Sequence, residues 1–445
     1  MPLDMVRAVP AIRRDPLDYL ERLVGRYGDL VAFPMPRSAV LLVNDPAGAR
    51  RVLVENARNY SKATIQYGAL SAVTGAGLLT ADGEEWRQRR RIVQPAFHHA
   101  SLDAVAEQSV AAGARVLAGW AGQPDGSVVD VDAACMRATL EVVGRTLFDA
   151  DLAADGERVV AAVHDALEVV VQRARTPRPA WLPLPSRRRL ARAVATLDET
   201  CARVVRVRRA RGLGQDDDLL GLLLRSADEH GGLTDRQVRD ELVTLVIAGH
   251  ETVASAMAWT LQLLAEHPDV QAQVQAEVDA VAGGRALAWS DVPRLVRTRQ
   301  VVDESLRLFP PAWVVTRRAR EADVVAGVAV PAGTLVILSP WLLHRRPQAW
   351  PDPLRFDPDR FATPRDSAPR GDYLPFGAGP RLCIGRDFAL VESVLALATV
   401  LAGVRVEPAE AAARPRVDAL VTLRPHGGLP LRLVHRAGHG VPPLG

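Results

Sequence analysis

The residues with the clearest chemical potential lie in FGAGPRLCIG, residues 376–385, which holds one of the chain's three cysteines. Cys383 directly precedes an apolar helical pattern, and the unpaired N–H groups at a helix start favour a thiolate. The three glycines of the segment let the backbone turn tightly and approach something large and flat. A lone cysteine is more often a small buried hydrophobe, so this feature alone leaves a ligand, a nucleophile and a structural residue open.

A second group of chemically useful side chains lies in LVTLVIAGHETVASA, residues 242–256. Thr244, Ala248 and Thr252 fall on one i, i+4 row of a predicted helix, where the small Ala248 leaves room for a small molecule. Glu251 places a carboxylate next to the Thr252 hydroxyl, and such a pair can relay protons. The alternative interpretation makes Thr252 a core threonine bonded to its own helix and Glu251 a surface residue.

Regularly spaced arginines form two further candidate groups. In EEWRQRRRIVQPAF, Trp86 and Arg90 lie one helical turn apart and therefore point to the same side. A solvated basic face or a nucleic-acid patch would explain this segment equally well. In ESLRLFPP, Glu304 and Arg307 share a helix face, and the helix ends at Pro310.

In this order along the chain, the motifs resemble those of the cytochrome P450 family, and FGAGPRLCIG closely resembles its haem-binding loop. The resemblance implies that haem b is the cofactor and that the Cys383 thiolate is the axial iron ligand. It places Phe376, Arg381 and Gly385 in the same loop against the haem. It extends over nearly the whole chain, as far as VTLRPHGGLPLRL.

The resemblance also implies roles for the acidic groups. Thr252 and Glu251 become the acid–alcohol pair that delivers protons during oxygen activation. Glu304 and Arg307, joined by Arg360 of FDPDRF, become a buried cluster that braces the haem loop. This second role is structural, because removing one partner would leave a buried charge without its counterion.

Donors to the haem propionates are implied at several places. Trp86 and Arg90 are one pair, Arg381 is another donor, and either Arg317 or Arg318 is the last. The spacer after these neighbouring arginines is one residue longer than is usual in the family, which leaves the choice between them open. Arg317 is the preferred candidate.

The substrate pocket is predicted from position in the family pattern. Two segments are expected to act as lids over it, a loop over 61–80 and TPRPAWLPLP at 176–185. The lining is mostly apolar and favours a lipophilic, largely uncharged substrate such as a terpenoid, polyketide or fatty-acyl compound of secondary metabolism. The predicted lining residues are Thr244, Ala248, Trp313, Val314 and Thr422.

The bulk composition is that of a globular protein. With 48% hydrophobic and 24% charged residues the chain can bury a large core, and a formal charge of +3 gives little support to nucleic-acid binding. Apolar stretches such as VLALATVLAGV are shorter than the roughly 18 residues of a membrane helix, and the N-terminus lacks a signal-peptide core. An odd number of distant cysteines argues against disulfides or a multi-cysteine zinc site. We expect a cytoplasmic monomer without a membrane anchor.

The elements that position the motifs are mostly helices. YGDLVAF and SAVLLVNDP read as two short strands, and a helix is predicted over about 82–93. Amphipathic helices fill most of 100–210. Thr234 and Gln237 form a capping box for the longest helix, which runs to the proline after His267.

The last third of the chain is predicted to contain short strands after residue 320 and one further helix after Cys383. Few of the helices could bury their apolar faces alone, so we expect one domain over residues 1–445. The fold class is mainly α with a minor β region. The resemblance implies the triangular helical prism with small sheets that is the cytochrome P450 fold.

The function implied is that of a haem-thiolate monooxygenase, which activates O2 with two externally supplied electrons and oxidises, typically hydroxylates, a small molecule. A separate ferredoxin or flavodoxin with its reductase is expected to supply the electrons. We expect it to dock on the Cys383 side, near Arg381, Arg386 and the arginines of 87–91. The alternatives are a peroxide-driven peroxygenase, a non-catalytic haem sensor or carrier, and a nucleic-acid-binding protein.

Overall fold

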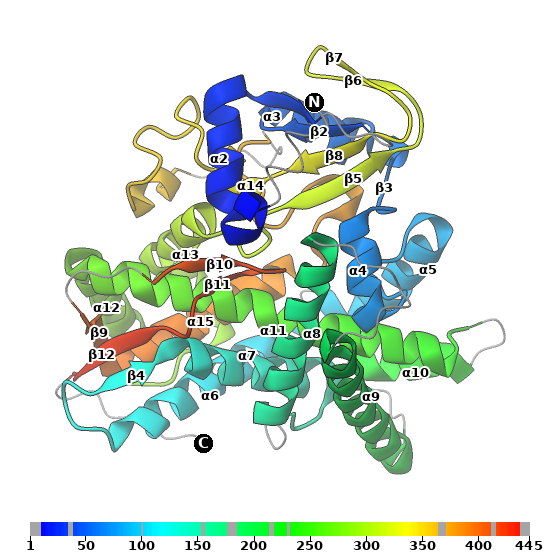
Figure 1. Ribbon diagram of the computed structural model, residues 1–445. Coiled ribbons are helices and arrows are strands. Elements are labelled where there is room, and N and C mark those ends of the chain that lie inside the picture. Colours follow the sequence, from blue (N-terminus) through cyan, green and yellow to red (C-terminus); the bar gives the residue numbers. More distant parts are fainter. Residues whose placement is uncertain are drawn as a thin grey trace.

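Helices form most of the structure, and small sheets lie at its edges (Figure 1). The computed structural model describes residues 10–33, 39–98, 101–152, 156–175, 185–212, 218–228, 232–363, 371–410 and 415–436. The α-helices are α2 (Pro16–Tyr27), α3 (Pro46–Arg50), α4 (Ile65–Thr74), α5 (Gly83–Val93), α6 (Leu102–Ala121), α7 (Val131–Phe148), α8 (Gly156–Arg175), α9 (Pro185–Arg211), α10 (Leu219–Asp228), α11 (Asp235–Glu266), α12 (Pro268–Ala282), α13 (Val296–Leu308), α14 (Pro340–Leu343) and α15 (Arg386–Gly403). The mainly α class with a minor β region is confirmed.

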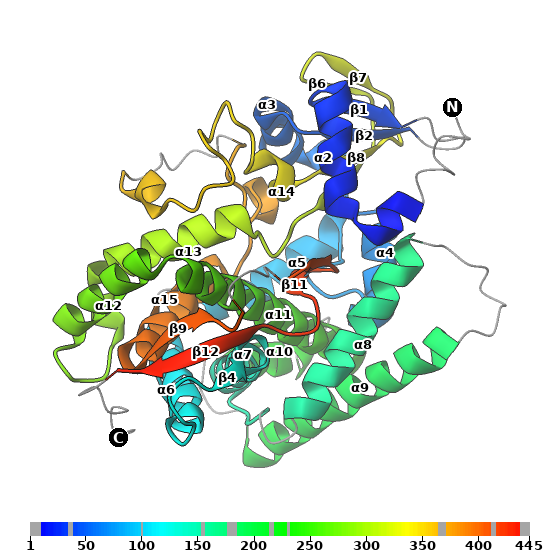
Figure 2. The same cartoon turned by 60° about the vertical axis from the view of Figure 1, so that its left-hand side comes forward.

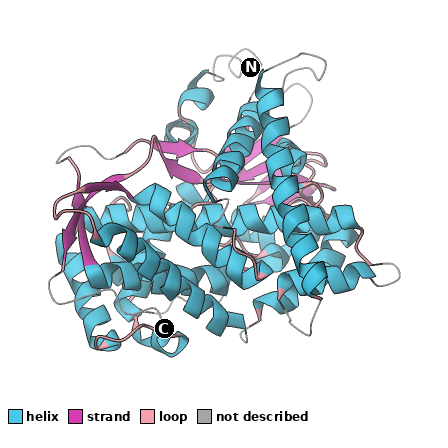
Figure 3. Cartoon of the chain, turned by 90° about the horizontal axis from the view of Figure 1, so that it is seen from below, coloured by secondary structure: helices cyan, strands magenta, loops and turns pink. Residues whose placement is uncertain are grey.

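The strands are short and form separate small sheets. They are β1 (Leu30–Phe33), β2 (Val40–Val43), β3 (Tyr60–Ser61), β4 (Val128–Asp130), β5 (Val315–Ala319), β6 (Asp323–Val325), β7 (Val328–Val330), β8 (Leu335–Leu338), β9 (Val404–Pro408), β10 (Val417–Ala419), β11 (Leu423–Pro425) and β12 (Pro430–His435). Seen from below, they gather in two groups at the edge of the helical body (Figure 3).

The longest helix, α11, runs through the middle of the molecule (Figure 1). Its predicted capping box is present: Thr234 Oγ1 accepts from the Gln237 N–H, and the Gln237 side chain accepts from the Thr234 N–H. Its 32 residues correspond to about 48 Å. The helix is long and apolar enough to cross a bilayer, but 83% of its most apolar window is buried by the other helices, as in a core helix.

Helices α7, α12, α13 and α15 pack against α11, and α6 packs on α7 and α15 (Figure 2). All of them share one hydrophobic core, which extends from Leu17 to Leu433. The approach of α6 to α15 is close. A Cβ on Gly113 of α6 would lie 2.9 Å from Thr399 Cβ of α15. Because α15 follows Cys383 directly, this packing fixes the position of the cysteine loop.

The sheet that carries the predicted propionate arginines has the strand order β1-β2-β8-β5-β3. The strand pair predicted near the N-terminus is its β1–β2 hairpin, in which Leu30 pairs with Val43. Strand β5 lies between β8 and β3, and its residue Arg317 is paired with Val336 of β8. A second sheet, β4-β12-β9, brings the start of α7 to the C-terminal strand.

The segment over 61–80 is not the continuous loop that the sequence predicts. Residues Ile65–Thr74 form helix α4, because Thr64 caps its first turn and an apolar side packs Leu70 and Val73 into the core. The second predicted lid is described only from Pro185, where α9 begins, and residues 176–184 lie outside the described part of the chain.

Candidate active site

The loop before Cys383 folds back on itself through backbone hydrogen bonds. The Cys383 N–H donates to the Phe376 carbonyl at 3.0 Å, and the Gly377 N–H donates to the Leu374 carbonyl at 3.1 Å. Gly377 and Gly379 have φ values of 71° and 68°, which favour glycine. A Cβ on Gly379 would lie 2.0 Å from the Leu53 carbonyl oxygen, so this glycine is also required for space.

The thiol of Cys383 differs from the other two cysteines in being accessible. Cys135 and Cys201 are buried in the core, and burial raises the pKa of the Cys201 thiol to about 12. Cys383 is exposed, yet enough protein surrounds it that desolvation raises its pKa, against the opposing effects of the Gly385 N–H, Arg90 and Arg386. A metal cation would supply the charge that holds this sulfur as a thiolate.

The predicted propionate donors converge from separate elements. The Arg381 guanidinium lies 3.9 Å from the Trp86 ring centroid and donates to the Ala81 carbonyl at 2.9 Å. Arg90 of α5 donates to the Leu382 carbonyl at 3.0 Å, beside the cysteine. Arg317 of β5 donates to the Tyr67 hydroxyl at 3.2 Å. The structure therefore brings all of these side chains into one group.

The two neighbouring arginines of β5 face opposite sides. Arg317 is 6% exposed and lies in the group just described. Arg318 donates to the Ala63 carbonyl at 2.7 Å and the Gly333 carbonyl at 2.8 Å, on the other face of the strand. The alternation of a strand thus favours Arg317 as the propionate donor.

Sequence reasoning missed three members of this group, Lys62, Tyr67 and Asp82. The Arg381 guanidinium pairs with Asp82 at 2.5 Å, and the Lys62 ammonium lies 4.8 Å from the Tyr67 ring centroid. A signal was present for Lys62, because it is the only lysine in the sequence. Asp82 and Tyr67 had none, since they are placed by contacts that join distant segments.

The helix α11 is open along one short stretch. Between Asp240 and Ala265 every residue is buried except Ala248, Gly249 and Thr252. The Thr252 hydroxyl donates to the Ala248 carbonyl at 2.7 Å, as in the alternative interpretation of this residue.

Glu251 is buried, so the expectation of a surface glutamate in that same alternative is wrong. Its carboxylate accepts from the Thr422 hydroxyl at 3.2 Å and lies 3.6 Å from the Arg424 guanidinium. Arg424 in turn pairs with Asp132 of α7 at 2.6 Å. The carboxylate and the Thr252 hydroxyl therefore have different partners in this structure.

Two further titratable groups lie beside Glu251. Burial raises the pKa of Asp132 to about 6, against the favourable charge of Arg424. Burial lowers the pKa of His250 to about 4, so its imidazole is neutral at neutral pH. Neither ring nitrogen of His250 has a hydrogen-bond partner among the described residues.

The predicted substrate residues divide by their accessibility. Ala248 and Val314 are partly exposed. Thr244 is 1% exposed beneath Gly77, where an added Cβ would lie 2.0 Å from Thr244 Oγ1. Trp313 and Thr422 are also buried, the first with its indole N–H donating to the Leu420 carbonyl at 2.9 Å. Of these five residues, only Ala248 and Val314 are thus accessible to a ligand in this structure.

The predicted Glu-Arg-Arg cluster is assembled. The Glu304 carboxylate binds Arg307 in a bidentate pair at 2.6 and 2.7 Å with both side chains fully buried, and Arg360 lies 3.5 Å from it. Arg307 donates to the His344 carbonyl at 2.9 Å. The Leu374 N–H donates to His344 Nε2 at 2.7 Å. His344, which sequence reasoning missed, thus links the cluster to the start of the cysteine loop.

The arginines of α5 do not all lie on the surface. Arg89 is 1% exposed and pairs with Glu241 at 2.9 Å and Glu85 at 2.8 Å. The prediction that the whole run is available to a partner protein is therefore wrong at Arg89. Arg87 and Arg91 are exposed, and both line a shallow cavity of about 360 Å³.

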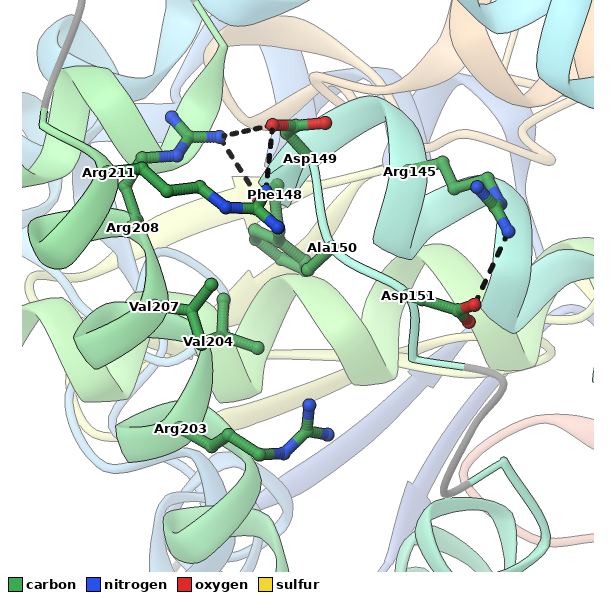
Figure 4. Close-up of a pocket in the computed structure, with 10 residues that line it drawn as sticks. All are labelled: Arg145, Phe148, Asp149, Ala150, Asp151, Arg203, Val204, Val207, Arg208 and Arg211. Atoms are coloured by element: carbon green, nitrogen blue, oxygen red, sulfur yellow. Dashed lines mark hydrogen bonds and ion pairs between the residues drawn. The ribbon is translucent and has the colours of Figure 1, made fainter.

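A separate cavity of about 410 Å³ lies between the end of α7 and α9 (Figure 4). Its arginines face acidic neighbours. Arg145 lies 3.4 Å from Asp151, and Arg208 lies 3.6 Å from Asp149. It shares no residue with the predicted site.

The donor set fits a haem. Among the residues that the structure describes, no group of three His, Cys, Asp or Glu side chains could hold a metal ion, so Cys383 would be its single protein ligand and a macrocycle would supply the others. The nearby cations match the two carboxylates of such a macrocycle. A single accessible thiol before a helix, with a group of cations beside it, is an arrangement that suits a haem-thiolate site.

Comparison with known proteins agrees with the interpretation of these residues as a haem-thiolate site. The family model described as Cytochrome P450 matches residues 2–430, and the chain belongs to this family. It is 37% identical to cyclooctatin synthase of Streptomyces melanosporofaciens, over 93% of this chain and 90% of that protein. It is 35% identical to pentalenene oxygenase of Streptomyces avermitilis, over 95% and 94% of the two chains. The crystal structure of CYP175A1 from Thermus thermophillus aligns with a TM-score of 0.77 at 30% identity, over 96% and 97%. The protein is a cytochrome P450 monooxygenase.

Proposed function

We propose that this monooxygenase hydroxylates a lipophilic terpenoid in secondary metabolism. The observation that carries the substrate class is the likeness to cyclooctatin synthase and to an oxygenase named for pentalenene, a cyclic hydrocarbon. The accessible part of α11, at Ala248, Gly249 and Thr252, has small or weakly polar side chains. Such a surface suits an uncharged, apolar ligand.

The cofactor we propose is haem b, held within a single domain over residues 1–445. Bound haem would supply the redox chemistry of O2 activation. Cys383 would hold its iron, while Trp86, Arg90, Arg317 and Arg381 would hold its propionates. Phe376 and Gly385 would lie against the ring as parts of the same loop.

Proton delivery is the proposed task of Thr252 and Glu251. At rest the Thr252 hydroxyl donates to Ala248, so it must exchange that bond to donate a proton into the pocket. Glu251 is the neighbouring buried acid that can resupply the proton after turning from Thr422 and Arg424. Their separate partners make this turn a required step.

Electrons would come from a separate ferredoxin or flavodoxin and its reductase in the cytoplasm. The exposed Arg87 and Arg91 are the surface cations of α5 that we assign to this partner. Glu304, Arg307 and Arg360 would brace the haem loop through His344 and take no part in the chemistry.

The first experiment is the difference spectrum of the dithionite-reduced protein with and without carbon monoxide. We expect the red-shifted Soret band of thiolate-ligated ferrous haem, and its loss in Cys383→Ala. The buried Cys201→Ala should keep the band, which controls for removing a cysteine. A protein that binds no haem, or shows only a histidine-type spectrum, would contradict the proposal. Turnover of a cyclic terpene with a surrogate ferredoxin then tests the substrate class.

A further inference from the structure

Helix α9 lies at the outer edge of the molecule, with α8 beside it (Figure 1, Figure 2). It carries nine arginines and only two acids, in a chain whose formal charge is +3. One side of the helix packs Leu190, Leu197 and Val204 into the core. The opposite side is a ridge of exposed residues at steps of four and three positions, which we call the α9 ridge: Arg188, Arg192, Ala195, Glu199, Ala202, Arg206 and Arg209.

Arginines on the flanks of α9 have acidic partners on neighbouring segments. Arg189 pairs with Asp165 and Glu168 of α8, each at 2.6 Å. Arg208 is buried and pairs with Asp218 at 2.6 Å. These flanking arginines therefore join α9 to the rest of the protein.

The arginines of the α9 ridge differ in this respect. Among the residues that the structure describes, Arg188, Arg192 and Arg206 have no hydrogen bond and no ion pair. The acid of the ridge, Glu199, pairs with Arg158 of α8 and so does not neutralise them. Three unpaired cations thus extend over about 27 Å along one face of the helix.

The charge and shape of the α9 ridge fit an acidic helix of a partner protein. Ala195 and Ala202 separate Arg192 from Arg206, so a second helix can approach closely at the middle while its carboxylates reach guanidinium groups at both ends. Steps of four and three positions are those of a seam along which two helices pack. A bilayer is a poorer match, because no ridge residue has a large apolar side chain to bury. A phosphate backbone would meet the Glu199 carboxylate at the centre.

We propose that the α9 ridge is a docking surface for an acidic helix of a partner protein other than the electron donor. The arginines assigned to the donor, Arg87 and Arg91, lie on a different helix, α5. Exposed arginine–carboxylate pairs contribute little each and are screened by ions, so the complex should be weak and should tighten at low salt. The proposal does not depend on the haem site, and a protein without a thiolate-type carbon monoxide band should bind the helix equally well.

A designed peptide tests the match. The probe is a fluorescent helical peptide of about 24 residues, or ~36 Å, with glutamate pairs one turn apart near both ends and alanines between them. The control peptide has the same composition, with its glutamates distributed around the helix. In anisotropy titrations of the full chain, we expect the patterned peptide to bind about tenfold more tightly than the control and to lose affinity as salt rises. Equal affinities of the two peptides would overturn the proposal.

Charge reversal locates the binding surface. Arg192→Glu combined with Arg206→Glu should weaken binding of the patterned peptide about tenfold or more, because attraction becomes repulsion at both ends of the ridge. Both side chains are exposed, so these changes should leave the far-ultraviolet circular dichroism unchanged. Arg22→Glu combined with Arg26→Glu changes the net charge equally at exposed positions of α2 and should not alter the affinity. An equal loss in both double variants would show an effect of net charge alone and contradict a docking site on α9.

Other anionic ligands distinguish the kind of partner. If phosphatidylglycerol vesicles or a short single-stranded RNA bound the wild type more tightly than the peptide, and lost binding in Arg192→Glu with Arg206→Glu, the assignment to a protein helix would be wrong. A saturating concentration of the patterned peptide should leave the rate of reduction by a ferredoxin unchanged. A slower rate would make the α9 ridge part of the electron-donor face and exclude a separate partner.

Discussion

Arg424 is shared between two buried acids, Asp132 and Glu251, and this sharing decides where the Glu251 carboxylate points. The shorter contact, at 2.6 Å, goes to Asp132. Because a buried guanidinium needs a counterion, weakening one acid strengthens its hold on the other. Asp132 is therefore a positioning residue for Glu251, and it lies on α7, where no local sequence pattern marks it.

The raised pKa of Asp132 has a consequence for stability. Since its folded pKa of about 6 exceeds the ordinary value of 3.8, the folded protein holds this proton more tightly than the unfolded chain. The associated stabilisation is complete below pH 3.8 and is lost as the pH rises through 6. The unfolding free energy of the wild type should therefore fall, relative to that of Asp132→Asn, by on the order of 1 kcal/mol between pH 5 and pH 8.

Urea unfolding at the two pH values measures this difference. Asp18→Asn, which removes a half-exposed carboxylate on α2, is the control for the loss of one negative charge. If the gap between Asp132→Asn and the wild type were the same at both pH values, the buried carboxyl would not titrate in this range.

The cysteine loop owes its shape to two kinds of glycine. Gly379 has positive φ and sits against the Leu53 backbone, whereas Gly385 has a φ of −91°, which any residue adopts. A Cβ on Gly385 would meet only the Phe97 ring, at 3.6 Å. The expectation that all three loop glycines permit tight turning thus holds at Gly377 and Gly379 but not at Gly385.

Alanine at these positions should separate them. Gly379→Ala should cost about 2 kcal/mol or more, because it combines strained φ with a backbone overlap, and should weaken the carbon monoxide band. Gly385→Ala should stay within about 0.5 kcal/mol of the wild type. Denaturant midpoints report both effects, and equal losses of stability in the two variants would contradict the steric account.

The complete site exists only in the folded chain. Its proposed cationic cradle takes Arg90 from α5, Arg317 from β5 and Arg381 from the loop before α15. Long-range contacts also determine the neighbouring surface, because Arg89 is buried while Arg87 and Arg91 remain exposed on α5. Long-range packing therefore sets both the interior charge and the proposed docking face.

Charge reversal tests that docking face. Arg87→Glu combined with Arg91→Glu should lower the rate of electron transfer from a reduced ferredoxin about tenfold at low salt and flatten its salt dependence. Arg188→Glu, an exposed arginine on α9, should change neither. Stopped-flow reduction at several salt concentrations is the measurement. A matching loss in both variants would indicate a general charge effect instead of a docking site.

Local pattern was sufficient for the main elements. The helix α11, its capping box and the β1–β2 hairpin all follow from nearby residues, because caps, periodicity and turn residues act over a few positions. The helix within 61–80 was missed, since its stability depends on packing Leu70 and Val73 into a core that the sequence does not display.

By itself the sequence determined the family, the cysteine loop and the residues that could hold a haem, because these are contiguous motifs whose residue types carry the chemistry. Only the tertiary structure decided that Arg317 faces the cradle while Arg318 faces away, that Arg89 is buried against Glu241, and that Glu251 turns to Arg424. The physical reason is that burial and pairing depend on which distant segment covers a side chain. The local periodicity of a helix or strand does not encode which distant segment packs over a side chain.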